Sequence, residues 1–252
     1  MLDSLAQQAD FLSQDLEHHL LGNHLFVNAK ALIFAGLFLG GRAATKWLET
    51  GLKIYDRELN EQVLPDGGNF ELTPMYHVIM LVDLLDLINI FTAYSNKIDS
   101  CVIDNTKKYV VKMLDWMQKM SHADGEISFF NDTALGIAPK NSVVMGYAKK
   151  LGFIPALPRV LSPGTLEIFD LKNSGHVGAR SYEYSLLADL SPVGPDYIPG
   201  HAHADTLSFE FSLGGQRVFV NSGISEYGLS EERLGQRKTA AHNTVSVDGM
   251  DS

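Results

Sequence analysis

Polar residues with metal-binding and proton-transfer groups stand at every second position in the stretch GHAHADTLSFEF, as His201, His203 and Asp205. An apolar alternation follows them, which is typical of a β-strand. Because side chains two apart on a strand point to the same face, the three could project together, although Gly200 leaves the local backbone open. Imidazole and carboxylate groups bind metal ions and transfer protons. The stretch therefore indicates a polar site at the start of a strand.

Two further polar residues lie at the ends of strand-like runs. Asn221 ends the run RVFVN, and His242 precedes the run NTVSV. Two imidazoles and one oxygen ligand can hold zinc and leave a fourth position for water. His203, His242 and an oxygen donor are therefore a candidate metal site. The alternative is that these residues are strand-end side chains hydrogen-bonded to loops, because a His-x-His pair alone is a weak signal.

Two other stretches place polar residues at the start of apolar segments. Asn23 and His24 precede an apolar helix in LLGNHLFVNAKALIF, and Tyr76 and His77 follow Pro74 in GNFELTPMYHVIM. Each has an ordinary structural explanation. Asn is a common helix cap with a surface His beside it, and an aromatic residue at a helix start can pack on the core. Neither stretch identifies a site by itself.

The elements that position these residues change character along the chain. In the first 150 residues or so, apolar residues recur near helical spacing, which predicts helices at about 5–20, 29–39, 47–59, 75–94 and 102–120. Turn residues fill 64–74. Helical hairpins joined by loops are therefore expected in this part of the chain.

Short alternating runs replace the helical pattern after a proline-rich segment near residue 155. They predict strands at 166–169, 182–187, 207–213, 218–220 and 244–247. Helices followed by strands are typical of an α+β multidomain fold with an antiparallel sheet. We place the boundary between a helical domain, 1–158, and a β domain, 159–252.

Composition excludes several classes of protein. The chain has 252 residues, a formal net charge of −10 and a single cysteine. The charge disfavours nucleic acid and anionic membranes as partners, and one cysteine can form neither an intrachain disulfide nor a cysteine-based zinc site. The N-terminus does not read as a signal peptide, and the apolar stretch 29–40 is too short to span a membrane. Both ends look cut, so we expect a piece of a longer protein.

Taken together, the motifs resemble a known family. GNHLFVNAKALIFAGL, DGGNFELTPMYH, GPDYIPGHAHADTLSFEFSLGGQRVFVNSG and AHNTVSVDG, in this order, look like the heparinase II/III-like polysaccharide lyases. The resemblance implies a partial (α/α) toroid of helical hairpins followed by an incomplete antiparallel β-sandwich. Members of this family are usually longer. The chain would thus hold the later part of the toroid and the first part of the sandwich.

The resemblance also implies a reaction, β-elimination on a uronic-acid polysaccharide. Asn23 and His24 would bind and neutralise the uronate carboxylate, which makes removal of the C5 proton feasible. Tyr76 would be the general acid to the leaving oxygen, and also the base for one C5 configuration. His201 would face the cleft as the base for the opposite configuration. A tyrosine base needs a lowered pKa, which nearby cationic groups could provide.

A metal site is implied by the same resemblance. His203, Asn221 and His242 would hold Zn²⁺ that ties the sheet together, with His203 pointing away from the cleft. Relatives usually carry Asp where this chain has Asn221, and a neutral amide is a weaker zinc ligand because it brings no charge. Asp205 or Asp248 could then be recruited.

Cationic residues near His242 suggest where an acidic polysaccharide would bind. Arg237 and Lys238 lie just upstream of it, and Arg233 is a weaker candidate. The alternative is a solvated loop.

Two other functions stay open. A glycoside hydrolase on the same toroid needs two carboxylates across a cleft, for which Asp66, Glu71, Asp124 and Glu126 are available but lack a catalytic context. A non-catalytic polysaccharide-binding protein, or a capsule or O-antigen assembly protein, needs no such pair.

Overall fold

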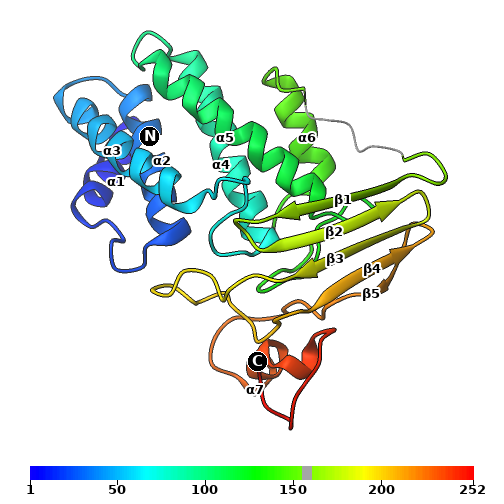
Figure 1. Ribbon diagram of the computed structural model, residues 1–252. Helices are drawn as coiled ribbons and strands as arrows, with labels where there is room; N and C mark the ends of the chain where they lie inside the picture. The colour runs from blue at the N-terminus through cyan, green and yellow to red at the C-terminus, as the bar shows by residue number, and fades with distance from the viewer. Residues whose placement is uncertain (155–160) are drawn as a thin grey trace. The chain divides into compact units, whose positions relative to one another are not determined.

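Helices precede a β-sheet in the computed structural model, which describes residues 1–154 and 161–252 (Figure 1). Among the described residues six helices come first, five strands follow, and a short helix and a 3₁₀ turn come after the strands. The predicted order of helices and then antiparallel strands is confirmed. The predicted domain boundary at 158/159 lies outside the described residues.

The chain divides into two compact units. The first is Met1–Val63 with Val82–Val110, and the second is Leu64–Leu81 with Val111–Ser252. Two helices, α4 (Pro74–Ala93) and α5 (Ser100–Lys119), contribute residues to both units. The catalytic residues that the resemblance implies therefore belong to both units. Asn23 and His24 lie in the first unit, and Tyr76 and His201 lie in the second.

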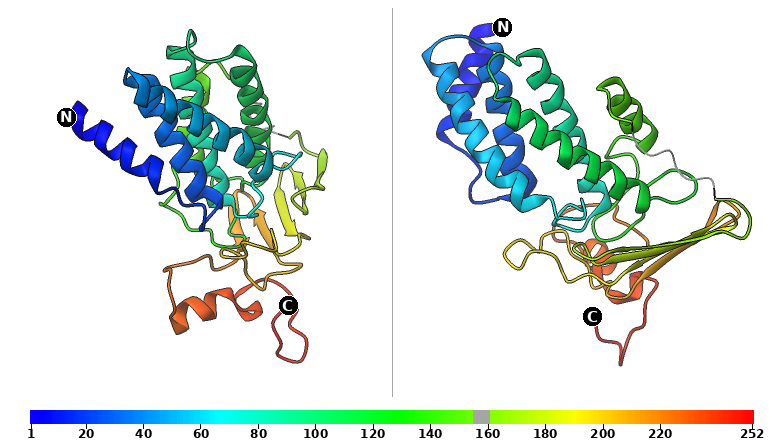
Figure 2. Two further views of the ribbon diagram at one scale, coloured as in Figure 1. Left: turned by 90° about the vertical axis from the view of Figure 1, so that its left-hand side faces the viewer. Right: turned by 45° about the horizontal axis from the view of Figure 1, so that its top comes forward.

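Three helices lie side by side in the first unit, α1 (Leu2–Gln14), α2 (Gly22–Phe38) and α3 (Arg42–Gln62) (Figure 2). Glycines allow α2 and α3 to approach closely. A Cβ on Gly36 would lie 2.7 Å from the Ala44 carbonyl oxygen, and one on Gly51 would lie 2.9 Å from that of Ala29. A larger residue at either position would push the helices apart.

One helix among the described residues, α4, is long and apolar enough to cross a membrane. Over half of its most apolar window, 56%, is buried inside the fold. A helix that is apolar all round is also what the core of a folded domain requires.

The sheet of the second unit is an antiparallel meander whose five strands pair in chain order (Figure 1). The strands are β1 (Leu166–Leu171), β2 (His176–Ser181), β3 (Tyr184–Asp189), β4 (Phe209–Leu213) and β5 (Gln216–Phe219). Helix α6 (Asn141–Lys150) precedes the sheet; α7 (Glu231–Arg237) and the turn Thr239–Ala241 follow it.

The structure differs from the strand predictions in three places. The sequence analysis missed β2, because HVGARS has no apolar alternation; Gly178 in its centre leaves room for the ring of Phe169 on β1. The strand predicted at 244–247 is wrong, since Val247 there pairs only with Met250 across a tight turn. The run at 207–213 becomes a strand only from Phe209, because Leu207 adopts a positive φ of 63°.

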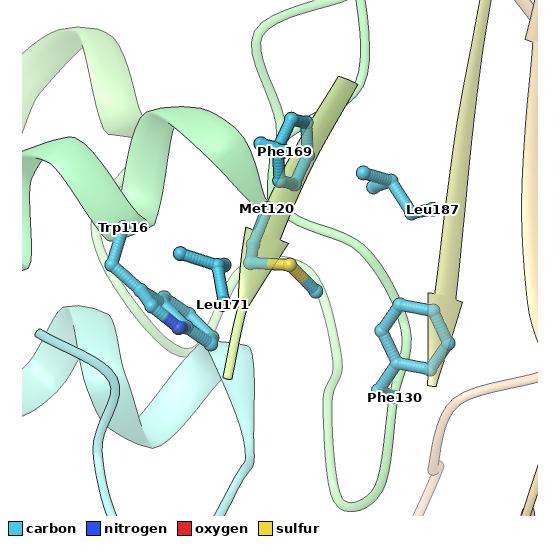
Figure 3. Close-up of a cluster of buried hydrophobic side chains, with 6 residues drawn as sticks. All are labelled: Trp116, Met120, Phe130, Phe169, Leu171 and Leu187. Carbon is cyan, nitrogen blue, oxygen red and sulfur yellow. The ribbon is translucent and has the colours of Figure 1, made fainter. Parts of the chain in front are cut away.

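Side chains from helix and sheet share a buried cluster in the second unit (Figure 3). Trp116 comes from α5, Met120 directly follows that helix, Phe130 lies in the loop beyond it, Phe169 and Leu171 come from β1, and Leu187 comes from β3. The cluster fixes the 127–133 loop against one face of the sheet.

The opposite face of the sheet carries apolar side chains that are open to solvent. Ile168, Leu186, Phe211 and Phe219 align across β1, β3, β4 and β5. Ile168 is 73% exposed and Phe219 is 51% exposed. In the described part of the chain no second sheet covers this face, which agrees with an incomplete β-sandwich.

His77 is part of the core of the second unit. Its Nε2–H donates to the Met113 carbonyl at 2.9 Å, and its ring lies 4.3 Å from that of Trp116. Burial lowers the pKa of His77 from 6.5 to about 4, although the Met113 hydrogen bond acts in the opposite direction. His77 therefore packs in the core, as the structural explanation of the GNFELTPMYHVIM stretch allowed.

His77→Gln should reduce the acid sensitivity of folding. Between pH 6.5 and pH 4 the unfolded chain binds a proton at His77 that the native state excludes, so stability present above pH 6.5 is lost as the pH falls. The loss amounts to about 3 kcal/mol at one His. Urea unfolding gives the gap in unfolding free energy between variant and wild type. Between pH 7 and pH 4 this gap should change by about the same amount, in favour of the variant. An unchanged gap would contradict the assignment.

Candidate active site

The segment that carries His201 and His203 is a loop, because β4 begins only at Phe209. Main-chain and side-chain contacts hold it. The Asp132 N–H donates to the His201 carbonyl at 3.2 Å, the His203 N–H donates to Asn131 Oδ1 at 2.9 Å, and Arg237 donates twice to the Ala202 carbonyl, at 2.7 and 2.9 Å. Regular strand alternation therefore does not apply to these residues.

Asp132 lies at the centre of the site, with a fully buried side chain. His201 Nδ1–H donates to its Oδ2 at 2.8 Å and His203 Nε2–H donates to its Oδ1 at 2.6 Å. Arg233 donates to Oδ2 at 2.6 Å and pairs with Oδ1 at 2.5 Å. Burial alone would raise the pKa of Asp132, but the hydrogen bonds from both histidines and Arg233 hold it well below its ordinary value. An ionised Asp132 only accepts hydrogen bonds, so the neutral form of His201 keeps its lone pair on Nε2.

The two histidines do not separate as completely as expected. The side chain of His201 is 20% exposed and that of His203 is fully buried, but both bind the same carboxylate. His203 turns inward because its second nitrogen faces His242. His201 is thus the histidine that a ligand can reach.

Tyr76 stacks on His201. The ring centroids are 4.0 Å apart with 30° between the planes. Tyr76 lies in the first turn of α4, where Pro74 begins the helix. Its hydroxyl is 3.0 Å from the hydroxyl of Tyr227. The stack joins residues 125 positions apart into one site.

The pKa of Tyr76 is raised, not lowered as the sequence analysis expected for a tyrosine base. Burial is the main cause, and the charges of Asp132 and Glu71 add to it; the Tyr227 hydrogen bond and Arg233 oppose it. Tyr76 is therefore protonated near neutral pH. In this state it can donate a proton to a leaving group.

Glu71 contacts the other nitrogen of His201. Its buried side chain places Oε2 at 3.3 Å from His201 Nε2. His201 thus lies between two carboxylates, with Asp132 on Nδ1 and Glu71 on Nε2. A substrate that uses Nε2 has to share this nitrogen with Glu71 or displace it.

Asp132 and Tyr227 were not singled out from the sequence, and Arg233 was considered only as a cation for the polysaccharide. Asp132 follows Asn131, which has a positive φ of 52° in a loop that no periodic pattern marks. Arg233 is buried, and its guanidinium lies 5.5 Å from the ring centre of Tyr227. Asp132 stands between the apolar runs ISFF and ALGIA, and a single sequence does not distinguish such a charged residue from an ordinary loop carboxylate.

The predicted substrate-binding cations have different environments. Arg237 uses its guanidinium on the Ala202 carbonyl and also reaches the Pro199 carbonyl at 3.5 Å. It therefore supports the loop that carries His201. Lys238 is exposed. A role of either in polysaccharide binding stays a prediction.

Two of the carboxylates considered for a hydrolase have structural contacts. Asp66 Oδ2 accepts from the main-chain N–H groups of Asn173 and Ser174, at 2.9 and 2.7 Å. Asp124 pairs with Arg217 at 2.8 Å. Glu71, the third of the four, contacts His201, with Oε2 at 3.3 Å from Nε2.

His203 and His242 fit a metal ion in part. His203 Nδ1 and His242 Nε2 are 3.2 Å apart, close to the ~3.3 Å that two ligands of a tetrahedral zinc show at Zn–N distances of about 2.0–2.1 Å. Burial lowers the pKa of both residues, to about 4 for His242, which keeps them in the neutral form that binds metal. The contact of His203 with Asp132 matches the carboxylate that commonly supports a zinc-bound histidine.

A third ligand is less well supplied. Asn221 is buried, but its Oδ1 accepts from the Asn243 N–H at 3.2 Å. The described residues contain no group of three or more His, Cys, Asp or Glu side chains that could hold a metal. A hydrogen bond between the two imidazoles accounts equally well for the distance of 3.2 Å between His203 Nδ1 and His242 Nε2. Zinc binding by His203, Asn221 and His242 therefore stays a prediction.

Asn23 and His24 lie in the first turn of α2. Leu21 occupies the cap position, and no side chain caps the helix, so the alternative of Asn23 as a helix cap is wrong. Asn23 is half-buried, whereas His24 is exposed with Nδ1 at 3.6 Å from Glu17. Their assignment as carboxylate binders stays a prediction.

Two family models and several known lyases are similar to this chain. Residues 1–157 match the model of the Heparinase II/III N-terminus, and residues 163–252 match the Heparinase II/III-like, C-terminal model. The heparin-sulfate lyase of Bacteroides stercoris is 30% identical over 90% of this chain and 36% of its own length. That of Pedobacter heparinus is 26% identical over 99% of this chain and 39% of its own length.

Solved structures show the same fold. Heparinase III superimposes with a TM-score of 0.79 at 21% identity, covering 98% of this chain and 42% of that one. Heparan sulfate lyase HepC from Pedobacter heparinus gives a TM-score of 0.69 at 24% identity, covering 99% and 40%. The chain spans 36–39% of the length of the curated relatives it matches. Since the N-terminal model alone matches more than half of its residues, the chain belongs to the heparinase II/III family.

Proposed function

We propose that this chain carries the acid–base residues of a polysaccharide lyase that cleaves a uronic-acid-containing glycosaminoglycan by β-elimination. The observation that carries the proposal is the stack of Tyr76 on His201, with His201 oriented by Asp132. The similarity to three heparin-sulfate lyases supports the choice of substrate class.

In the proposed reaction the two stacked residues have opposite roles. His201 takes the C5 proton on Nε2, because Asp132 occupies Nδ1–H. The C5–H electron pair forms the C4–C5 double bond, the C4–O bond breaks, and the leaving oxygen takes the proton of Tyr76. The raised pKa of Tyr76 favours this acid role over the base role that one C5 configuration would require.

Asn23 and His24 complete the proposal as donors to the uronate carboxylate. The intermediate carries a second negative charge on that carboxylate, so hydrogen-bond donors there stabilise the transition state more than the ground state. Asn23→Ala should therefore lower kcat as well as raise KM.

A panel of polysaccharides tests the proposed function. Heparin, heparan sulfate, hyaluronan, alginate and glucuronan are incubated with the protein and followed by ultraviolet absorbance and chain length. A lyase produces an unsaturated, absorbing sugar. Shortening without absorbance would indicate a hydrolase instead, and polymer of unchanged length would indicate a binding or assembly protein.

We also propose that Zn²⁺ binds to His203 and His242, with Asn221 as the weaker third ligand. The ion would be structural and would tie the β4–β5 region to the segment after α7. Elemental analysis of freshly purified protein should find zinc at or below one per chain, and His242→Ala should remove it. A chelator should lower the melting temperature of the wild type but not of this variant. Zinc that is absent from the wild type, with no chelator effect, would contradict the site.

A further inference from the structure

We propose that Tyr227 is a second tyrosine of the acid–base site and returns a proton from solvent to Tyr76 after each turnover. This inference rests on the function proposed above. It assigns a role to a residue that neither the family resemblance nor the sequence pattern singles out.

The position of Tyr227 connects the site to solvent. Its hydroxyl lies 3.0 Å from that of Tyr76, while the residue itself is 50% exposed. Tyr76 is half-buried under His201 and burial raises its pKa, so a phenolate left there is costly. The hydroxyl of Tyr227 is thus an exposed hydrogen-bond neighbour within proton-transfer distance.

The ring of Tyr227 is held by other groups of the site. Its plane meets the ring of His201 nearly edge-on, with centroids 6.4 Å apart and 81° between planes. The guanidinium of Arg233, which pairs with Asp132, lies 5.5 Å from its ring centre. Aromatic and cation–π contacts of this kind fix a ring without using its hydroxyl. The hydroxyl is therefore left for Tyr76.

The loop that carries Tyr227 is anchored beside Asp132. The Ile224 N–H donates to the Thr133 carbonyl at 3.2 Å. Gly223 has a positive φ of 65°, and a Cβ there would lie 2.6 Å from the same carbonyl oxygen, so only glycine permits this approach. On the other side, the Ser225 N–H donates to Gln236 Oε1 at 3.0 Å. The segment 131–133 thus positions both His201 and the Tyr227 loop.

Proton balance explains why a relay is needed. After elimination, His201 holds the C5 proton and Tyr76 has given its own to the leaving oxygen. The next cycle requires His201 to lose a proton to solvent and Tyr76 to regain one. In the proposed step the Tyr227 O–H bond breaks and its proton forms the new Tyr76 O–H bond, while Tyr227 takes a proton from a buffer acid or hydronium ion in the same step. The transfer is concerted because burial raises the pKa of Tyr227 as well, so that a free Tyr227 phenolate is also costly. The net change over the cycle is the elimination alone.

Tyr227→Phe tests the relay, because it keeps the ring contacts and removes only the hydroxyl. We expect kcat to fall about 100-fold, at the lower end of the range of about 10²–10⁴ for one proton-transfer group, with KM changed less than twofold. Imidazole buffer at increasing concentration should restore part of kcat in the variant and leave the wild type unchanged. Tyr182→Phe, an exposed tyrosine outside the site at 60% exposure, is the matched control and should behave as wild type.

The possible outcomes are distinguishable. A variant with wild-type kcat, or one whose loss no buffer acid restores, would overturn the relay and leave the proposed function intact. A wild-type chain that forms no unsaturated product from any polysaccharide would overturn the proposed function and the relay with it.

Discussion

Tyr76→Phe should abolish turnover and leave the fold nearly unchanged. The substitution keeps the ring that stacks on His201 at 4.0 Å and removes the one proton that the leaving oxygen can take from this side chain. General acid catalysis contributes about 10²–10⁴ in rate, so kcat should fall at least ~10²-fold. The lost contact with the Tyr227 hydroxyl is partly exposed and should cost no more than about 1 kcal/mol of unfolding free energy.

The measurement combines initial rates of unsaturated product with urea unfolding and polysaccharide binding. Tyr184→Phe is a suitable control, because this tyrosine packs on Phe211 on the outer face of the sheet. Binding within about twofold of wild type, with turnover lost, would identify a defect in chemistry. Full activity of the Tyr76 variant would remove it from the mechanism, whatever its position beside His201.

The first five helices and four of the five strands could be predicted because their signals are local, whereas α6 and α7 were not predicted. The helical periodicity that begins near residue 75 corresponds to α4, and the alternation near residue 209 corresponds to β4. The errors also have local causes. β2 contains Gly178 where a strand usually carries a packed side chain, and the 244–247 run alternates correctly but has no neighbouring strand to pair with.

The candidate site could be predicted only in the part that the family motifs cover. Tyr76 and His201 stand in recognisable stretches, and the structure brings their rings together. Asp132 lies 69 positions from His201 and 71 from His203, and no periodicity relates these residues. Its importance follows from the burial of four donors around one carboxylate, which is a property of tertiary packing. The raised pKa of Tyr76 has the same origin, because the sequence indicated nearby cations but not the burial that outweighs them.

Asp132→Asn should be the most damaging isosteric change in the second unit. The carboxylate accepts from His201, His203 and Arg233 with both oxygens, whereas an amide offers one oxygen and one donor group. One imidazole must then change tautomer to accept a hydrogen bond. If His201 does so, its Nε2 carries the proton and can no longer take one from C5. The corresponding tautomer error in the serine-protease triad lowers kcat by about 10⁴, and a loss of ~10³–10⁴ is expected here.

The same substitution should also destabilise the fold, because it leaves the buried charge of Arg233 without its partner. Breaking a buried ion pair on one side typically costs about 3–5 kcal/mol.

A second variant separates the effect on stability from the effect on turnover. Asp132→Asn combined with Arg233→Met removes the unpaired charge, so unfolding in urea should recover much of the lost stability while kcat stays low. If the double variant regained activity along with stability, Asp132 would act through folding alone. If nitrogen NMR showed the proton of His201 still on Nδ1 in Asp132→Asn, the tautomer argument would fail; a proton moved to Nε2, together with the lost turnover, is the result that the geometry around Asp132 predicts.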